Sequence, residues 1–133
     1  MQNARLLKKE DEVDVDVNWE DQQRINKFGR LNQRVHELEA DIGRWQEELD
    51  NLEDASTEVL MADDDDALRF QIGEVFVMLP ADEVEARIEA LQEETEAKVT
   101  AAEAEIETLR EALAELKVVL YGKFKNSINL EES

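Results

Sequence analysis

The sequence predicts a mainly α-helical protein: a long antiparallel two-helix coiled coil whose helices are joined by one β-hairpin. Three observations lead to this prediction. Charged residues make up 38% of the chain and aromatic residues only 5%, which is poor material for the core of a globular domain. Apolar residues recur at spacings of three and four along two long segments. Between these segments lies the one run rich in β-branched and aromatic residues, 68–79.

The first helix is expected over residues 19–62, after a flexible tail over residues 1–17 that shows no helical periodicity. Asn18 suits the N-cap position, because its side chain can accept a backbone N–H of the first turn. The four aspartates 63–66 are poor helix formers and should end the helix. The predicted seam of this helix consists of Phe28, Leu31, Val35, Leu38, Ile42, Trp45, Leu49, Leu52, Ser56 and Val59.

Residues 67–79 are predicted to form the β-hairpin. Gly73-Glu74 suits a two-residue type II′ turn, because glycine reaches positive φ without strain. This turn pairs apolar residues on one side of the ribbon: Ile72 with Val75, Phe70 with Val77, and Leu68 with Leu79. A two-stranded hairpin alone is marginal in water, so this one is expected to pair with strands of other subunits.

The second helix is expected over residues 82–124, followed by a tail over residues 125–133. Pro80 should end the preceding strand, and Asp82 with Glu85 resembles a capping box. Gly122 is a candidate helix stop, although the helix can also run on through Phe124. The predicted seam, with one four-residue stutter after Thr95, consists of Ile88, Leu91, Thr95, Val99, Ala102, Ile106, Leu109, Leu113, Leu116 and Leu120.

Folding the chain back about the turn pairs the two seams residue by residue. The numbers of facing residues add up to 147 or 148 along both helices. The bulky Trp45 falls opposite the small Ala102, as expected of a packed seam. The helices are therefore predicted to pair with each other in a single domain over residues 18–124, with the hairpin at the closed end of the coil.

The charge and the cysteine count exclude several classes of function. With 35 Asp plus Glu against 15 Lys plus Arg, the net charge of −20 argues against direct binding to nucleic acid or an anionic membrane. The absence of cysteine excludes disulfides, thiol catalysis and thiolate metal sites. No run approaches the roughly 18 apolar residues of a membrane-spanning helix, and no signal peptide is recognisable. We therefore expect a soluble intracellular protein.

No pattern in the sequence is typical of an enzyme, so we expect no catalytic residues, no cofactor and no metal site. Glycine-rich phosphate loops and nucleophile elbows are absent. The single histidine, His36, is expected to be a surface residue of the first helix. The aspartates 63–66 lack the spaced ligands of a calcium-binding loop and are interpreted as a solvated loop.

Two regions carry more apolar side chains than a coiled coil needs. The hairpin residues expected to drive assembly with other subunits are Leu68, Phe70, Ile72, Gly73, Val75, Phe76 and Val77. At the open end of the coil, large apolar residues continue where the seam runs out: Trp19, Ile25, Phe28, Leu120, Tyr121, Phe124, Ile128 and Leu130. This second group either binds a partner or caps the end of the coil.

Four segments, in this order around one hairpin, carry a family resemblance that covers the chain from about residue 17. They are EDQQRINKF at 20–28, NLEDA at 51–55, QIGEVF at 71–76, and LYGKF at 120–124 with INL at 128–130. Together they resemble the β-type subunits of eukaryotic prefoldin. Gly122 and Lys125 depart from the usual YAKFG of the ending, which leaves the end of the second helix open.

The resemblance implies a heterohexamer in which this chain joins two α-type and three further β-type subunits, with the hairpins building a β-barrel platform. It also implies an ATP-independent co-chaperone in the cytoplasm, with a nuclear pool allowed. Such a complex captures unfolded proteins, chiefly actin and tubulin, at the coiled-coil tips and passes them to the cytosolic group II chaperonin. Two alternatives stay open: a coiled-coil scaffold or tether, and an acidic histone chaperone, although the longest acidic run is only 63–66.

Overall fold

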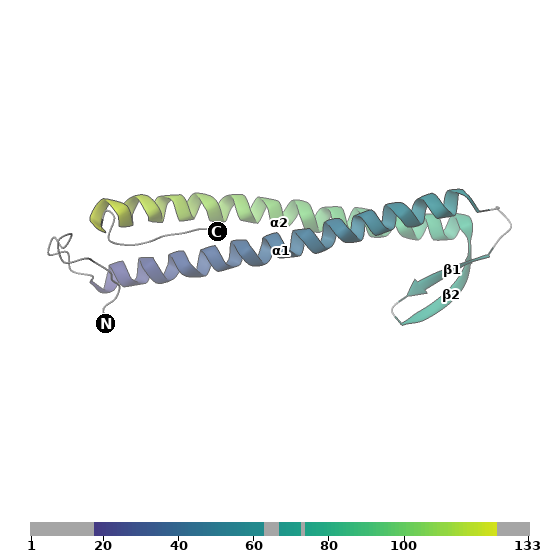
Figure 1. Ribbon diagram of the computed structural model, residues 1–133, viewed down its shortest axis with the longest axis horizontal. Helices are drawn as coiled ribbons and strands as arrows, with labels where there is room; N and C mark the ends of the chain where they lie inside the picture. The colour runs from purple at the N-terminus through teal and green to yellow at the C-terminus, as the bar shows by residue number, and fades with distance from the viewer. Residues whose placement is uncertain (1–17, 63–66, 73, 125–133) are drawn as a thin grey trace. The chain divides into compact units, whose positions relative to one another are not determined.

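The computed structural model describes residues 18–62, 67–72 and 74–124, apart from the side chain of Ile72. The predicted tails and Gly73 therefore lie outside the described residues. The elements follow in the order α1 (Trp19–Leu60), β1 (Ala67–Ile72), β2 (Val75–Pro80) and α2 (Ala81–Phe124) (Figure 1). The predicted fold class, two long helices with one β-hairpin between them in the chain, is confirmed.

The chain divides into two compact units. The first, here called the terminal unit, comprises residues 1–39 and 104–133, and its described part contains the start of α1 and the end of α2. The second, the hairpin unit, comprises residues 40–103 and contains the rest of both helices and the hairpin. The grouping of residues 18–124 into a single domain stays a prediction.

Helix α1 begins with a reciprocal cap. The side-chain oxygen of Asn18 accepts the N–H of Asp21 at 2.8 Å, which confirms Asn18 as the N-cap. The carboxylate of Asp21 in turn accepts the N–H of Asn18 at 3.3 Å. At the other end, α1 stops at Leu60, because the N–H groups of Met61 and Ala62 each donate to a carbonyl three residues back. The helix therefore ends two residues before the predicted position.

Helix α2 begins one residue before its predicted position and ends, as predicted, at Phe124. It begins directly after Pro80, and the predicted capping box of Asp82 and Glu85 is wrong. The carboxylate of Asp82 accepts the N–H of Glu83 at 2.9 Å, whereas that of Glu85 accepts the hydroxyl of Ser56 on α1 at 2.9 Å. Ser56, the one polar residue in the predicted seam of α1, thus has a hydrogen-bond partner on α2. At its C-terminal end α2 runs past Gly122 to Phe124, so that glycine is not a helix stop.

The strands pair antiparallel in the predicted register. Ile72 pairs with Val75, Phe70 with Val77 and Leu68 with Leu79, and the ladder extends to Ala67 opposite Pro80. Because the alternation of apolar residues sets which side chains share a face, the register could be derived from the sequence. The type of turn at Gly73 stays a prediction, since that residue lies outside the described part.

The core of each unit is a line of seam residues. In the terminal unit, the buried apolar residues are Phe28, Val35, Leu38, Ile106, Leu113, Leu120 and Phe124. In the hairpin unit, Ala81, Val84, Ile88 and Ala102 are buried together with Thr95. The predicted seam residue Leu91 is 36% exposed, and Gln92 is half-buried instead. The seam therefore steps by four residues from Ile88 to Gln92, so the stutter lies earlier in α2 than predicted.

Candidate interaction surfaces

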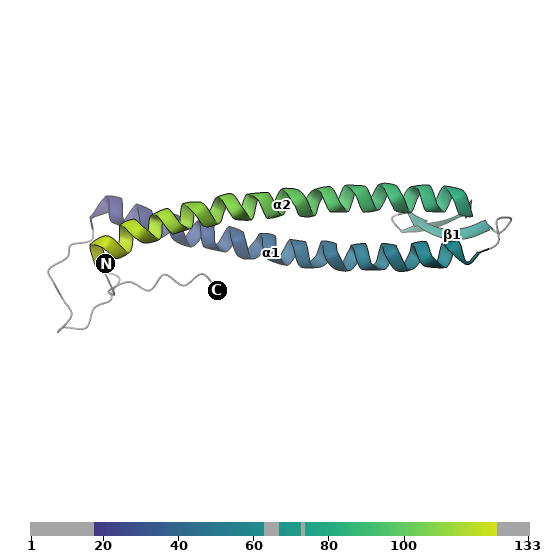
Figure 2. The ribbon, with the colours of Figure 1, turned by 90° about the horizontal axis from the view of Figure 1, so that it is seen from above.

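One face of the hairpin is turned toward the helices of its own unit. Leu68, Phe70, Val77 and Leu79 are half-buried on this face. A cavity of about 210 Å³ between the hairpin and the helices is lined mainly by apolar residues: Leu52, Ala55, Val59, Leu68, Phe70, Val84 and Ile88. In Figure 2 the hairpin lies beside the teal segments of α1 and α2. Seam residues of both helices therefore cover part of this apolar face. The expected pairing of the strands with those of other subunits stays a prediction.

The opposite face of the hairpin and its turn end are exposed. Phe76 is 51% exposed and Met78 62%, and Val75 beside the turn is 61% exposed. The guanidinium of Arg69 lies 4.3 Å from the centre of the Phe76 ring, a cation–π contact that orients the ring on the outer face. Within the described residues, the sheet has only these two strands, so each strand leaves one edge unpaired.

Met78 was missed, although it lies on the same outer face as Phe76, which was predicted. Two further exposed apolar residues were also missed: Leu60, 78% exposed, and Met61, 81% exposed, at the end of α1. Both are apolar residues that lie outside the heptad seam. This position is the feature of the sequence that could have identified them.

The predicted apolar residues at the open end of the coil separate into two groups. Phe28, Leu120 and Phe124 are buried, with exposed fractions of 4%, 0% and 3%, so they form the core of the terminal unit. Trp19 is 74% exposed and Tyr121 37% exposed, while Ile25 is half-buried. The two views show the purple start of α1 and the yellow end of α2 side by side (Figures 1 and 2). Ile128 and Leu130 lie outside the described residues.

Two exposed residues of α2 extend this apolar surface beyond the prediction. Val118 is 73% exposed and Val119 48% exposed, one turn or less before Tyr121. The heptad pattern does not mark them, because they fall between seam positions Leu116 and Leu120. Two adjacent valines outside the predicted seam are the signal that marks them.

Ion pairs join the two helices on the exposed sides of the terminal unit. Arg34 donates two hydrogen bonds to the carboxylate of Glu105, at 2.9 and 3.3 Å, and Arg110 donates to Glu39 at 2.6 Å. The hydrogen bonds from Arg34, reinforced by its charge, hold the pKa of Glu105 below its ordinary value, although slight desolvation opposes this. These pairs support the packing of α1 on α2 at positions that the seam alone does not cover.

Two other kinds of site are absent from the described residues. No group of three or more His, Cys, Asp or Glu side chains in the described part of the chain could hold a metal ion. No helix in residues 18–62 or 74–124 combines the length and the apolar character needed to cross a membrane. His36 is half-buried on α1, with its ring nitrogen 3.7 Å from the carboxylate of Glu39.

The profile of a protein family described as prefoldin subunit matches residues 22–127. The chain belongs to the prefoldin subunit family. Similar proteins include prefoldin subunit 4 of Homo sapiens and of Bos taurus, each 40% identical over 96% of this chain and 96% of the relative. A probable prefoldin subunit 4 of Dictyostelium discoideum is also 40% identical, over 96% of this chain and 97% of its own length.

A solved structure agrees with the fold. The crystal structure of the prefoldin beta subunit from Thermococcus strain KS-1 matches with a TM-score of 0.71 and 20% sequence identity, covering 84% of this chain and 97% of that chain. At this identity the likeness concerns the fold. The resemblance seen in the sequence is confirmed, and family membership implies assembly with other prefoldin subunits. Which residues make that assembly stays a prediction.

Proposed function

We propose that this prefoldin subunit works in a heterohexamer with two α-type and three further β-type subunits. The complex captures unfolded proteins, chiefly actin and tubulin, without ATP and passes them to the cytosolic group II chaperonin. It works in the cytoplasm, with a nuclear pool allowed. The observation that carries the proposal is the distribution of exposed apolar side chains: Val75, Phe76 and Met78 belong to the hairpin unit, whereas Trp19, Val118 and Tyr121 belong to the terminal unit.

The hairpin unit is the assembling part in this proposal. Its two unpaired strand edges can extend a sheet through backbone hydrogen bonds with a neighbouring subunit's strand. Phe76 and Met78 on the outer face then become buried in the core of a shared β-barrel. The inner face, with Leu68, Phe70 and Val77, anchors the hairpin to its own helices and so presents the strands in a fixed position.

The terminal unit is the client-binding part. Trp19, Val118 and Tyr121 offer apolar surface to a partly folded chain. The half-buried side chain of Ile25 adds a smaller apolar area. The buried Phe28, Leu120 and Phe124 act indirectly, because they hold the helices together beneath this surface. Each contact is weak, but contacts from several subunits to one client add up to strong binding. Release follows when the chaperonin competes for the client.

Assembly is tested by Phe76→Glu, with Val118→Glu as the matched control. Both place a carboxylate at an exposed apolar position, one in each unit. In a complex reconstituted with the other subunits, Phe76→Glu should abolish the hexamer in size-exclusion chromatography with light scattering, and Val118→Glu should leave it intact. An intact Phe76→Glu hexamer would contradict the proposed role of the hairpin.

Client capture is tested on intact hexamers that carry Trp19→Ser and Tyr121→Ser together. This pair should weaken the suppression of actin aggregation, while Leu91→Ser, an exposed position in the hairpin unit, should not. Equal suppression by the paired variant and the wild type would rule out this surface as the client-binding part. Transfer is followed with labelled actin, which should move to added chaperonin without ATP.

A further inference from the structure

One stretch of α1 is basic, although the chain as a whole is strongly acidic. Between residues 22 and 36 there is no acidic residue, although the whole chain has 35 of them. The same stretch contains four cations: Arg24, Lys27, Arg30 and Arg34. At 1.5 Å per residue it runs for about 20 Å along the helix. The chain therefore presents a short basic segment inside an acidic sequence.

The terminal unit, which contains this basic segment, is also much less acidic than the hairpin unit. The described part of the terminal unit has seven basic residues against eight acidic ones, whereas the described part of the hairpin unit has four against sixteen. Interactions between exposed charges are largely screened beyond about 10 Å at 0.1 M salt. The electrostatic interaction of an anionic ligand at residues 22–36 therefore depends mainly on the charges of the nearly neutral terminal unit. The net charge of −20 for the whole chain has little effect there.

Two of the four cations have no ion-pair partner among the described residues. Arg24 pairs with Asp21, and Arg34 pairs with Glu37 and Glu105. Lys27 and Arg30, both exposed, make no such pair within the part of the chain that the structure describes. Their charges are therefore available to a carboxylate from another molecule.

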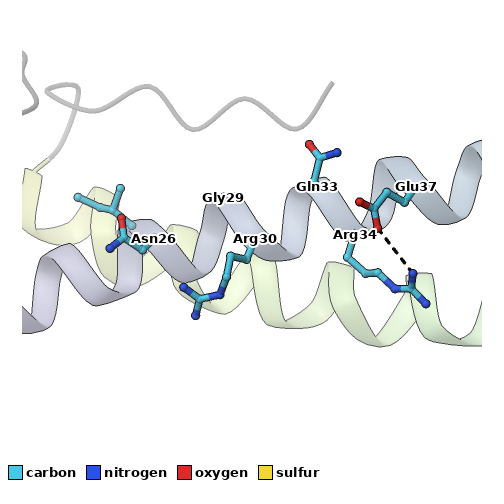
Figure 3. A pocket seen from close by; sticks show the side chains of 7 residues that line it. Asn26, Gly29, Arg30, Gln33, Arg34 and Glu37 are labelled. Carbon is cyan, nitrogen blue, oxygen red and sulfur yellow. Dashed lines mark ion pairs between the residues drawn. The ribbon is translucent and has the colours of Figure 1, made fainter.

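An open groove accompanies these cations on α1. It is lined by Ile25, Asn26, Gly29, Arg30, Gln33, Arg34 and Glu37. Figure 3 shows Arg30 and Gln33 projecting from opposite edges of α1 in this view, with Arg34 and Glu37 paired farther along the helix. A Cβ atom at Gly29 would meet no atom within 4 Å, so a ligand can approach the helix backbone there. The amide group of Gln33 can bond to peptide N–H and C=O groups. The amide nitrogen of Asn26 can donate to a peptide C=O, while its oxygen already accepts a hydrogen bond from Gln22 at 3.0 Å.

We propose that this basic groove binds a short, extended acidic segment of a partner protein. At roughly 3.3 Å per residue, such a segment would span the groove with about six residues. Carboxylates contact Arg30, which lines the groove, and Lys27, which lies outside the lining three residues earlier on α1. The backbone passes over Gly29, and the amides of Asn26 and Gln33 hold its orientation. Glu37 closes one end of the groove, and a nucleic acid, with its closely spaced phosphates, would run on into acidic surroundings.

The test uses a fluorescein-labelled peptide of about eight alternating glutamates and glycines, with fluorescence anisotropy as the readout. The protein is the full-length chain, alone and in its complex with the other prefoldin subunits. Wild type should bind saturably, and added salt should weaken binding. Lys27→Gln with Arg30→Gln should lower the affinity about tenfold. The control pair, Arg87→Gln with Lys98→Gln, removes the same charge from the hairpin unit and should change it by less than about twofold.

Two glycines of α1 provide a second matched comparison. Gly29→Leu fills the groove and should lower the affinity about fivefold, whereas Gly43→Leu should leave it unchanged. Both positions are exposed, and neither has an atom within 4 Å of the added Cβ, so both variants should fold. The measurement involves no unfolded client, so its outcome is independent of the proposed function.

Three results would overturn the proposal. The first is the absence of saturable binding by the wild type. The second is an equal loss of affinity in the two charge pairs or in the two glycine variants, which would show that net charge or helix content is responsible. The third is tighter binding of a single-stranded oligonucleotide of the same charge, which would make the groove a general polyanion site.

Discussion

Lys123, in the last turn of α2, donates a hydrogen bond to the buried carboxylate of Asp21 in the first turn of α1. Asp21 is 2% exposed, and it also accepts a hydrogen bond from Arg24 at 3.2 Å and the capping bond from Asn18. One carboxylate thus caps α1 and ties the two helices of the terminal unit together. Removing one partner of a buried ion pair destabilises a protein, because the remaining charge is then neither paired nor hydrated.

Lys123→Met should loosen this end of the helix pair. A buried pair broken on one side costs about 3–5 kcal/mol, but Arg24 still pairs with Asp21, so we expect a loss of about 1–2 kcal/mol. Hydrogen exchange of the backbone amides in the last two turns of α2 should accelerate, with a lower midpoint of urea unfolding.

Lys27→Met is the matched control, because Lys27 lies in the same unit, is exposed and has no ion pair among the described residues. It should leave the exchange rates near those of the wild type. Identical exchange in the two variants would mean that the Asp21–Lys123 pair contributes nothing to the stability of this end.

The role of Asp21 shows where prediction from the sequence stops. The sequence places Asp21 close to the N-cap Asn18, but its partner Lys123 lies 102 residues away. The same limit applies to Glu85, whose carboxylate bonds to Ser56 across the unit instead of capping its own helix. Local spacing predicts local partners, and it does not reveal which charged side chain a fold carries into a buried position.

Periodic features were predictable for the opposite reason. The strand register follows from alternation over a few residues, and the helices follow from spacings of three and four that continue for many turns. Leu91 and Gln92 show the weak point of such reasoning. Near a stutter, two adjacent positions compete for the seam, and the more apolar one was chosen although it is the exposed one.

Ala102→Leu tests the tight packing predicted for the seam of the hairpin unit. Ala102 is 3% exposed, and the seam pairing places it opposite Trp45, so three added carbons have no space. We expect a loss of about 1–3 kcal/mol in unfolding free energy from overpacking. Ala101→Leu, one residue earlier and exposed, should change stability by less than about 0.5 kcal/mol. Equal urea midpoints for the two variants would contradict the seam assignment.

Glu105 should give the pair with Arg34 a defined pH dependence. The hydrogen bonds from Arg34 lower the pKa of Glu105 in the folded state below its ordinary value of 4.5. A depressed carboxyl pKa stabilises the fold above the unfolded value, and this stabilisation is lost as the pH falls through the folded pKa. NMR titration of Glu105 should therefore show a higher pKa in Arg34→Gln than in the wild type.

Arg30→Gln, four residues away, provides the control for that titration. It removes the same charge without removing a hydrogen bond to Glu105, so the pKa of Glu105 should stay near its wild-type value. The difference in stability between wild type and Arg34→Gln should also vanish at a pH below the folded pKa. If it persists there, Arg34 stabilises the protein by packing and not through its bond to Glu105.

Gly43→Ala should stabilise the protein. Gly43 lies inside α1, is exposed, and a Cβ atom there would meet no atom within 4 Å. Alanine limits the freedom of the unfolded backbone and favours the helix over glycine by about 1 kcal/mol. The midpoint of urea unfolding should rise by a corresponding amount, with the slope of the transition unchanged. A lower midpoint for the free chain would contradict this prediction. A lower midpoint for the hexamer alone would mean that Gly43 contacts another subunit.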